Sequence, residues 1–312
     1  MLIPKVSWQT LRDHCLLAER LGFDHAWIDD HLTSPADPAQ DWLEAWSTLA
    51  ALATATTTIR LGSLVSSPVV RHPALLARQA LTVERISQGR LEVGLGSGYA
   101  DSDHALAGSR PWPGRERAER FREAVALADR VLRGEPVEPG RYYRSRIPPL
   151  GPRPVRSPRP PLTVAAHGPH AMATAARYGD AWSTFGGFGL SAAEHLDRTA
   201  RQARRMERAC EEAGRDPATL GRTLLTGRPL VSSENMWAEP GRFRELRLPL
   251  PCGSASTGSS STGHRRTTGR TARPTRTPSA ASSQMSSRHC GTAERRQLAA
   301  ARREGRPALR GG

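Results

Sequence analysis

Residues 58–98 read TIRLGSLVSSPVVRHPALLARQALTVERISQGRLEVGLGSG, and they decide the fold. The segment begins with a short apolar run, continues with apolar residues at helical spacing, and ends with a second apolar run. Pro73 stands where the helix should begin, since proline is tolerated in a first helical turn. A strand, a helix and a strand in this order predict two parallel strands joined by a right-handed crossover.

The same alternation continues on both sides of this segment. Ser7 is a predicted helix cap, residues 99–120 read as a polar insertion, and residues 134–161 are rich in proline and predict a surface hairpin. Strands that are apolar throughout are typical of a closed barrel, because both of their faces are buried. Further strands are predicted within 25–30, 161–169, 175–185 and 222–231, and further helices within 8–21, 41–53 and 121–132.

The composition changes near residue 246. Residues 247–312 carry thirteen arginines and two glutamates, so most of the formal charge of +15 lies in this tail. The tail is rich in serine and threonine and has no apolar period, which predicts disorder. We therefore divide the chain into a (β/α) barrel domain, 1–246, and a disordered basic tail, 247–312.

The tail also has the composition of a GC-rich gene read out of frame. Lys5 is the only lysine among 45 basic residues, and residues 254–270, shifted by one base, can be read as GVDGFVFYWPPPDDGP. This hypothetical sequence resembles a buried strand. Two alternatives are a genuine disordered tail and a basic arm that binds nucleic acid. The arm is the weaker alternative, because no aromatic residue follows Phe243 to stack on bases.

Several classes of protein are not expected. The chain has no apolar run long enough to span a membrane and no secretory leader. Its four cysteines lack the spacing of a metal site, so we expect reduced thiols and a cytoplasmic protein. No metal-ligand cluster and no Ser/His/Asp nucleophile set is apparent.

Three ordered motifs carry a resemblance to a known family. They are ERLGFDHAWIDDHL at 19–32, the segment 59–108, and PLTVAAHGPHAMATAARYGDAW at 161–182. Over about residues 5–230 the chain resembles the bacterial luciferase-like monooxygenases, and most closely the branch that includes coenzyme F420 enzymes. The resemblance implies a TIM (β/α)8 barrel, FMN or coenzyme F420 at the carboxyl ends of the strands, a small-molecule substrate and a homodimer.

The family comparison also implies that this barrel is incomplete at both ends. The chain starts at MLIPKVSW, about where the family's first strand ends, and the tail stands in place of the last strand. We expect the second and seventh strands of the barrel to be exposed edges, which favour aggregation.

The motif Asp29-Asp30-His31 follows a predicted strand, where barrel enzymes place their catalytic groups. A carboxylate beside an imidazole forms an acid/base pair that works near neutral pH. The resemblance assigns catalytic roles to Asp30 and His31. In the alternative interpretation, His31 caps a helix or binds a loop carbonyl.

A second candidate segment is the strand end at 64–67. Family members often hold a non-proline cis peptide here, against the flavin ring. The resemblance places it at Leu64–Val65, with Ser66 and Ser67 as ring or ribityl contacts. The alternative is a plain core strand.

Two glycine loops follow later strands, at 94–98 and 165–169. Glycines expose backbone N–H groups to a phosphate, and Pro169 can begin a helix whose N-terminus favours anions. A helix-capping turn is the alternative. Tyr99 replaces an acid that some deazaflavin dehydrogenases carry. The residues assigned to the cofactor in these loops are Gly96, Ser97, Gly98, Ala166, His167, Gly168 and Pro169.

Trp112, Arg117 and Arg120 lie in or after the polar insertion, where they could close on a substrate or on an anionic cofactor tail. A solvated helix face explains them equally well. The main interpretation is a flavin- or deazaflavin-dependent oxidoreductase of the monooxygenase type, acting on paired donors with molecular oxygen. The alternatives are deazaflavin-dependent hydride transfer without oxygen, an inactive gene product, and a barrel with a nucleic-acid-binding tail.

Overall fold

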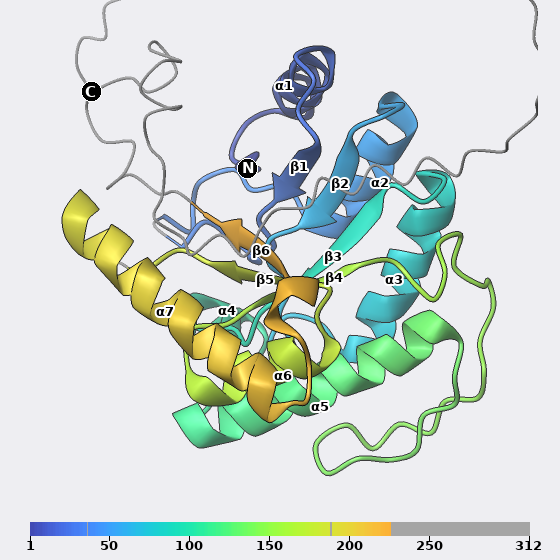
Figure 1. Cartoon of the computed structure of the whole chain (residues 1–312). Helices are drawn as coiled ribbons and strands as arrows, with labels where there is room; N and C mark the ends of the chain where they lie inside the picture. The colour runs from blue at the N-terminus through green and yellow to red at the C-terminus, as the bar shows by residue number, and fades with distance from the viewer. Residues whose placement is uncertain (36, 188, 226–312) are drawn as a thin grey trace, which may run out of the picture. The chain divides into compact units, whose positions relative to one another are not determined.

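Parallel strands in chain order form the centre of the structure, a computed structural model that describes residues 1–35, 37–187 and 189–225. The described part contains one six-stranded sheet in which each strand pairs with its neighbour in sequence, from β1 to β6 (Figure 1). All five pairings are parallel, as the βαβ pattern predicts. The strands are β1 His25–Ile28, β2 Arg60–Ser63, β3 Leu91–Leu95, β4 Leu162–Ala165, β5 Ala181–Thr184 and β6 Gly221–Leu224.

Helices cover the outside of this curved sheet (Figure 1). Helix α3 packs between α2 and α5, and α6 packs between α5 and α7. This is the arrangement of a TIM barrel, of which the described residues form six consecutive strands and their helices. The helices are α1 Trp8–Arg20, α2 Ala45–Ala55, α3 Pro73–Ile86, α4 Asp101–Leu106, α5 Gly114–Arg133, α6 Pro169–Tyr178, α7 Ala192–Glu212 and the short 3-10 helix η1 Pro217–Thr219.

The barrel interpretation is confirmed by the burial of the strands. All five residues of β3 are buried, and Leu91, Val93 and Leu95 are at most 4% exposed. Trp182 of β5 is 1% exposed, and its indole Nε1 donates a hydrogen bond to the Ala166 carbonyl at 2.8 Å. Along each strand, side chains point alternately to the barrel interior and to the helix layer, and both sets are removed from water.

The helix ends follow local chemistry. Ser7 caps α1 by accepting a hydrogen bond from the Thr10 backbone N–H, as predicted. Gly134, at φ 70°, ends α5 in the left-handed conformation that glycine adopts without strain. Ser191 and Glu194 form a capping box at the start of α7.

Two expected boundaries differ from the structure. Helix α2 begins at Ala45 and not near residue 41, because the Glu44 carboxylate caps it through the N–H groups of Trp46 and Ser47. The insertion predicted at 99–120 is largely helical, since it contains α4 and the first turns of α5. The polar start of α5 is stabilised by i,i+4 ion pairs, such as Arg120 with Glu116.

The two ends of the described chain lie at the edges of the sheet. Leu2 forms a single parallel bridge to Ile28 beside β1, and the predicted hairpin is present as an antiparallel bridge between Val137 and Ile147. The predicted tail, 247–312, its boundary at 246 and the end of the predicted strand 222–231 lie outside the described residues. Of the helices in the described part, none has the length and apolar character needed to cross a membrane.

Polar networks fasten the end of the barrel where the strands begin. The Arg90 guanidinium, just before β3, donates hydrogen bonds to the carbonyls of Ala53, Thr56, Ile59 and Ser87 and to the Thr56 hydroxyl. Beside it, the Glu19 carboxylate accepts hydrogen bonds from three successive backbone N–H groups at residues 57–59. These networks join the loops that precede β2 and β3.

Candidate functional site

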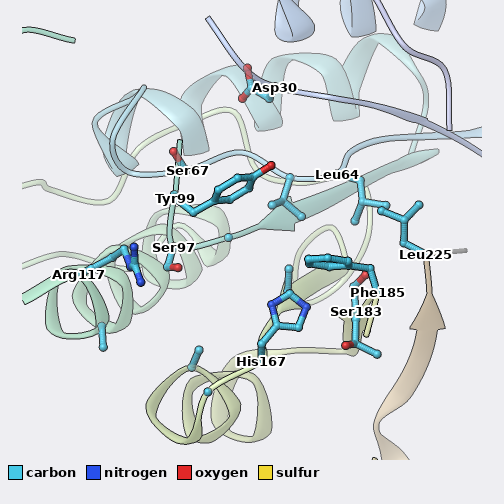
Figure 2. A pocket seen from close by; sticks show the side chains of 18 of the residues that line it. Asp30, Leu64, Ser67, Ser97, Tyr99, Arg117, His167, Ser183, Phe185 and Leu225 are labelled. Carbon is cyan, nitrogen blue, oxygen red and sulfur yellow. The ribbon is translucent and has the colours of Figure 1, made fainter. Parts of the chain in front are cut away.

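A cavity of about 680 Å³ opens where the strands end. Its described walls come from the loops after all six strands and from the first turns of α5 and α6 (Figure 2). Most residues that the sequence assigned to a site reach this cavity. They are Asp30, His31, Leu64, Val65, Ser67, Gly96, Ser97, Gly98, His167, Gly168 and Pro169.

His31 is held between two carboxylates. Its Nδ1 lies 2.6 Å from Asp103 Oδ2, and its Nε2 lies 3.6 Å from Asp29 Oδ1. The imidazole is mostly buried, with 14% of its side chain exposed. The Trp42 indole donates a hydrogen bond to the His31 carbonyl at 3.0 Å, which fixes the backbone at this position.

The surroundings of His31 favour its protonated form. Burial lowers the pKa of His31, but the hydrogen bond that its ring makes to Asp103 and the charges of Asp29, Asp103 and Asp30 outweigh burial, so the net pKa is raised. Burial raises the pKa of Asp29, as do the charges of Asp30 and Asp103, against the lowering effect of His31. A histidine and a neighbouring aspartate whose pKa values are both raised can hold and release a proton near neutral pH.

Asp30, the predicted catalytic carboxylate, is engaged elsewhere. It is 2% exposed and receives two hydrogen bonds from Arg71, at 3.1 and 2.8 Å, and one from the Ser66 hydroxyl at 2.5 Å. Arg71 also pairs with Glu44. The structure therefore places Asp29 and Asp103, and not Asp30, against the His31 imidazole. The strand ends at Ile28, so sequence alternation could not tell which aspartate faces the ring.

The Leu64–Val65 peptide bond is cis, at the position that the resemblance indicated. Leu64 and Val65 line the cavity, as does Ser67, whose buried hydroxyl has no hydrogen-bond partner among the described residues. Ser66, also assigned to the cofactor, is not brought to the cavity. It is fully buried, and its hydroxyl accepts a hydrogen bond from the Trp46 indole while it donates to Asp30.

The loop after β3 forms one wall of the cavity. A Cβ on Gly96 would lie 2.3 Å from the Val65 side chain, and one on Gly98, at φ +72°, would lie 2.6 Å from Val69. Larger residues would therefore displace the wall. Tyr99 follows this loop, is 58% exposed and meets the His31 ring edge to face at 6.0 Å. Burial raises the pKa of Tyr99, as do the charges of Asp29 and Asp103, so its hydroxyl stays protonated.

The loop after β4 leads into α6 on the opposite wall. Gly168 precedes α6 and has no side chain to cap it, so within the described residues the first N–H groups of the helix have no side-chain cap beside the cavity. His167 contacts Phe185 edge to face at 4.6 Å (Figure 2). Ala166 is 1% exposed, and its carbonyl accepts from Trp182, so the structure does not bring it to the cavity.

The three residues of the insertion have different positions. Arg117 lines the cavity on the side of Ser97 (Figure 2). Arg120 lies between the rings of Trp112 and Tyr142, at 4.6 and 4.5 Å from their centroids, and it pairs with Glu116. Arg120 and Trp112 thus hold the insertion against the hairpin, while Arg117 is available to an anion.

Sequence reasoning missed several residues of the cavity wall. Asp103 is the most important, because it binds His31 from 72 residues away along the chain. Its signal was an acid in the first turn of a helix after a glycine loop, which alone is too common to be noticed. Other missed wall residues include Ser183 and Thr184 at the end of β5, Phe185 directly after it and Leu225 directly after β6, which is where barrels place the residues of their catalytic face.

Comparison with known proteins identifies a family match over almost the whole chain. A family model described as luciferase-like monooxygenase matches residues 2–305. An F420-dependent hydroxymycolic acid dehydrogenase of Mycobacterium tuberculosis is 33% identical over 67% of this chain and 56% of its own length. An F420-dependent glucose-6-phosphate dehydrogenase of Beutenbergia cavernae is 37% identical over 56% of this chain and 52% of its own length. The chain thus spans about half the length of these curated relatives.

Solved structures share the fold. The coenzyme F420-dependent tetrahydromethanopterin reductase of Methanopyrus kandleri superposes with a TM-score of 0.60 at 23% identity, over 72% of this chain and 64% of its own. The monooxygenase RslO1 of Streptomyces bottropensis gives a TM-score of 0.57 at 25% identity, over 70% of this chain and 66% of its own.

Proposed function

This chain belongs to the luciferase-like monooxygenase family, and we propose that it is a coenzyme F420-dependent dehydrogenase or reductase. The observation that carries this proposal is the position of His31 between Asp29 and Asp103, at the carboxyl ends of the strands. The cavity beside it is large enough for a flat ring and a small substrate. The names of the curated relatives support hydride transfer better than our first expectation, oxygen incorporation.

The residues of the cavity fit a flat, partly polar ring with an anionic tail. Leu64 and Val65 offer an apolar face, and the Ser67 hydroxyl has no hydrogen-bond partner in the part of the chain that the structure describes. An anionic tail would find a cation in Arg117 and the N-terminus of α6, which has no side-chain cap in the described structure, and both favour negative charge. We assign Leu64, Val65, Ser67, Gly96, Ser97, Gly98, His167, Gly168 and Pro169 to cofactor binding. Ser66 and Ala166 act only through the neighbours that they hold.

A bound deazaflavin supplies a two-electron hydride acceptor or donor. The chain supplies the proton chemistry and the orientation. When an alcohol is oxidised to a carbonyl, its hydroxyl releases a proton, and His31 Nε2 is placed to accept it beside Asp29. In the reverse direction the protonated His31 donates to the carbonyl oxygen. The Tyr99 hydroxyl, protonated and exposed in the cavity, is a donor that can orient the same oxygen.

Titration of the purified chain with coenzyme F420 and with FMN tests the cofactor assignment. We expect micromolar-range binding of F420 and weaker binding of FMN, with Arg117→Ala weakening F420 and the exposed Arg115→Ala leaving it unchanged. A folded sample that binds neither cofactor would refute the proposal.

Oxygen consumption separates hydride transfer from the monooxygenase alternative, which the likeness to RslO1 favours. The reduced cofactor is mixed with a panel of ketones and aldehydes, with and without oxygen. We expect cofactor oxidation that depends on the carbonyl compound and proceeds without oxygen. Turnover that requires oxygen would establish the monooxygenase type instead. The predicted homodimer is tested on the same sample by light scattering.

A further inference from the structure

Asp103 contacts two successive positions of the His31 loop. Its Oδ2 lies 2.6 Å from His31 Nδ1, and its Oδ1 accepts a hydrogen bond from the Leu32 backbone N–H at 3.0 Å. The residue is 3% exposed, so both carboxylate oxygens act inside the protein. One carboxylate thus fixes both the imidazole and the backbone that carries it.

The two nitrogens of the imidazole have different surroundings. The short contact on Nδ1 suits an N–H donating to a carboxylate, which leaves Nε2 as the nitrogen that exchanges a proton. Nε2 lies 3.6 Å from Asp29 Oδ1, beyond hydrogen-bond distance, and both groups line the cavity. The ring is further confined by Tyr99 at 6.0 Å and Trp42 at 6.5 Å between centroids.

We infer that Asp103 is a positioning residue. It holds neutral His31 in the tautomer that carries its proton on Nδ1, so that the free Nε2 faces the cavity, and it stabilises the imidazolium form. This inference rests on the proposed function for its catalytic meaning, but the tautomer and the charge of His31 belong to the chain itself. The titratable groups around the ring are Asp29, Asp30, Tyr99 and Asp103, and Asp103 hydrogen-bonds its Nδ1.

Helix α4 is itself anchored, so Asp103 has a fixed position. The adjacent His104 is 2% exposed, lies 3.1 Å from the Ser109 hydroxyl and meets the Trp112 ring at 5.1 Å. Trp112 is in turn covered by the Arg120 guanidinium. This short helix is thus held on one side by the contact of Asp103 with His31 and on the other by the contacts of His104 with Ser109 and Trp112.

The test is histidine NMR on the cofactor-free chain, with His31→Gln used to assign the His31 signal. In Asp103→Asn the side chain keeps its shape but loses its charge. We expect the pKa of His31 to fall and its ring nitrogen shifts to show a changed tautomer. Asp101→Asn, an exposed substitution in the same helix, is the matched control and should change neither.

Turnover gives the second readout. In the direction of alcohol oxidation, Asp103→Asn should lower kcat about 10- to 100-fold, by analogy with residues that orient catalytic histidines at metal sites, with little change in KM. The pH at which activity rises should move lower. If Asp103→Asn changes neither the pKa nor the tautomer of His31 in a folded sample, or if Asp101→Asn changes them equally, the inference is wrong. If the NMR changes occur but no F420 binds, the proposed function fails and the positioning role stands.

Discussion

The two ends of the barrel treat their polar groups in opposite ways. Where the strands begin, the Arg90 guanidinium and the Glu19 carboxylate form hydrogen bonds mostly with backbone groups of neighbouring loops. Where the strands end, the Ser67 hydroxyl has no hydrogen-bond partner among the described residues, α6 starts without a side-chain cap, and the carboxylates of Asp29 and Asp103 flank the His31 imidazole. The first arrangement lowers the free energy of the folded state, and the second leaves polar groups that can bind a ligand.

This difference separates stability from function within one fold. Saturated buried polar groups contribute to the free energy of unfolding, since removing one partner leaves the others unsatisfied. Polar groups without partners beside a cavity lower the stability of the free chain, and they can hydrogen-bond a ligand when it binds. Substitutions at the two ends should therefore affect different measurements.

The largest expected effect is at the strand ends. His31→Gln should reduce turnover about 10²- to 10⁴-fold, the usual contribution of a general acid or base, while F420 affinity changes little. The melting temperature should stay close to that of the original chain. Stopped-flow rates and binding titrations on one sample give both values. An equal loss of affinity and rate would mean that His31 binds the cofactor and moves no proton.

At the opposite end, Arg90→Ala should lower the free energy of unfolding by about 3 kcal/mol, because several backbone carbonyls lose their donor. The exposed Arg85→Ala is the control and should change it by less than about 0.5 kcal/mol. Urea unfolding measures both. F420 affinity of the folded fraction should be unchanged in Arg90→Ala, and a selective loss of binding would erase the distinction between the two ends.

The pH dependence of stability sharpens the comparison through Glu19. Burial raises the pKa of Glu19, but hydrogen bonds from the backbone N–H groups of Thr58, Ile59 and Thr57 lower it more, from 4.5 to about 2. The ionised carboxylate therefore stabilises the fold above pH 4.5, and this contribution is lost as the pH falls toward 2. The difference in unfolding free energy between the original chain and Glu19→Gln should shrink over this range. A difference that is constant with pH would contradict it.

The smallest effect is expected from a pair of buried serines. The Ser63 hydroxyl donates to the Gly94 carbonyl at 3.1 Å, whereas the Ser67 hydroxyl has no hydrogen-bond partner within the described residues. Ser63→Ala should cost about 1 kcal/mol of stability, and Ser67→Ala should be neutral or slightly stabilising. Thermal unfolding compares the two. If Ser67→Ala destabilises the free chain as much as Ser63→Ala, the Ser67 hydroxyl has a structural partner after all.

Much of the fold follows from local sequence. The βαβ pattern of 58–98 predicts strands β2 and β3 with α3 between them. Ser7 and Pro73 mark helix starts, and the apolar runs mark strands, through residues that are close together in the chain. The insertion at 99–120 was harder, because a helix that faces solvent has no apolar period to reveal it. Ion pairs hold α4 and the start of α5: Asp103 with His31, and Glu116 with Arg110 and Arg120.

The sequence by itself determined that His31 follows a strand, and the family resemblance placed the cis peptide at Leu64–Val65, because both depend on residues next to each other. Only the tertiary structure decided which aspartate serves His31. Asp29 and Asp30 are chemically identical neighbours, and their roles were set by Arg71 and Asp103, which lie far away in the chain. A side chain's direction after the last paired residue of a strand depends on such distant contacts, and no local pattern encodes them.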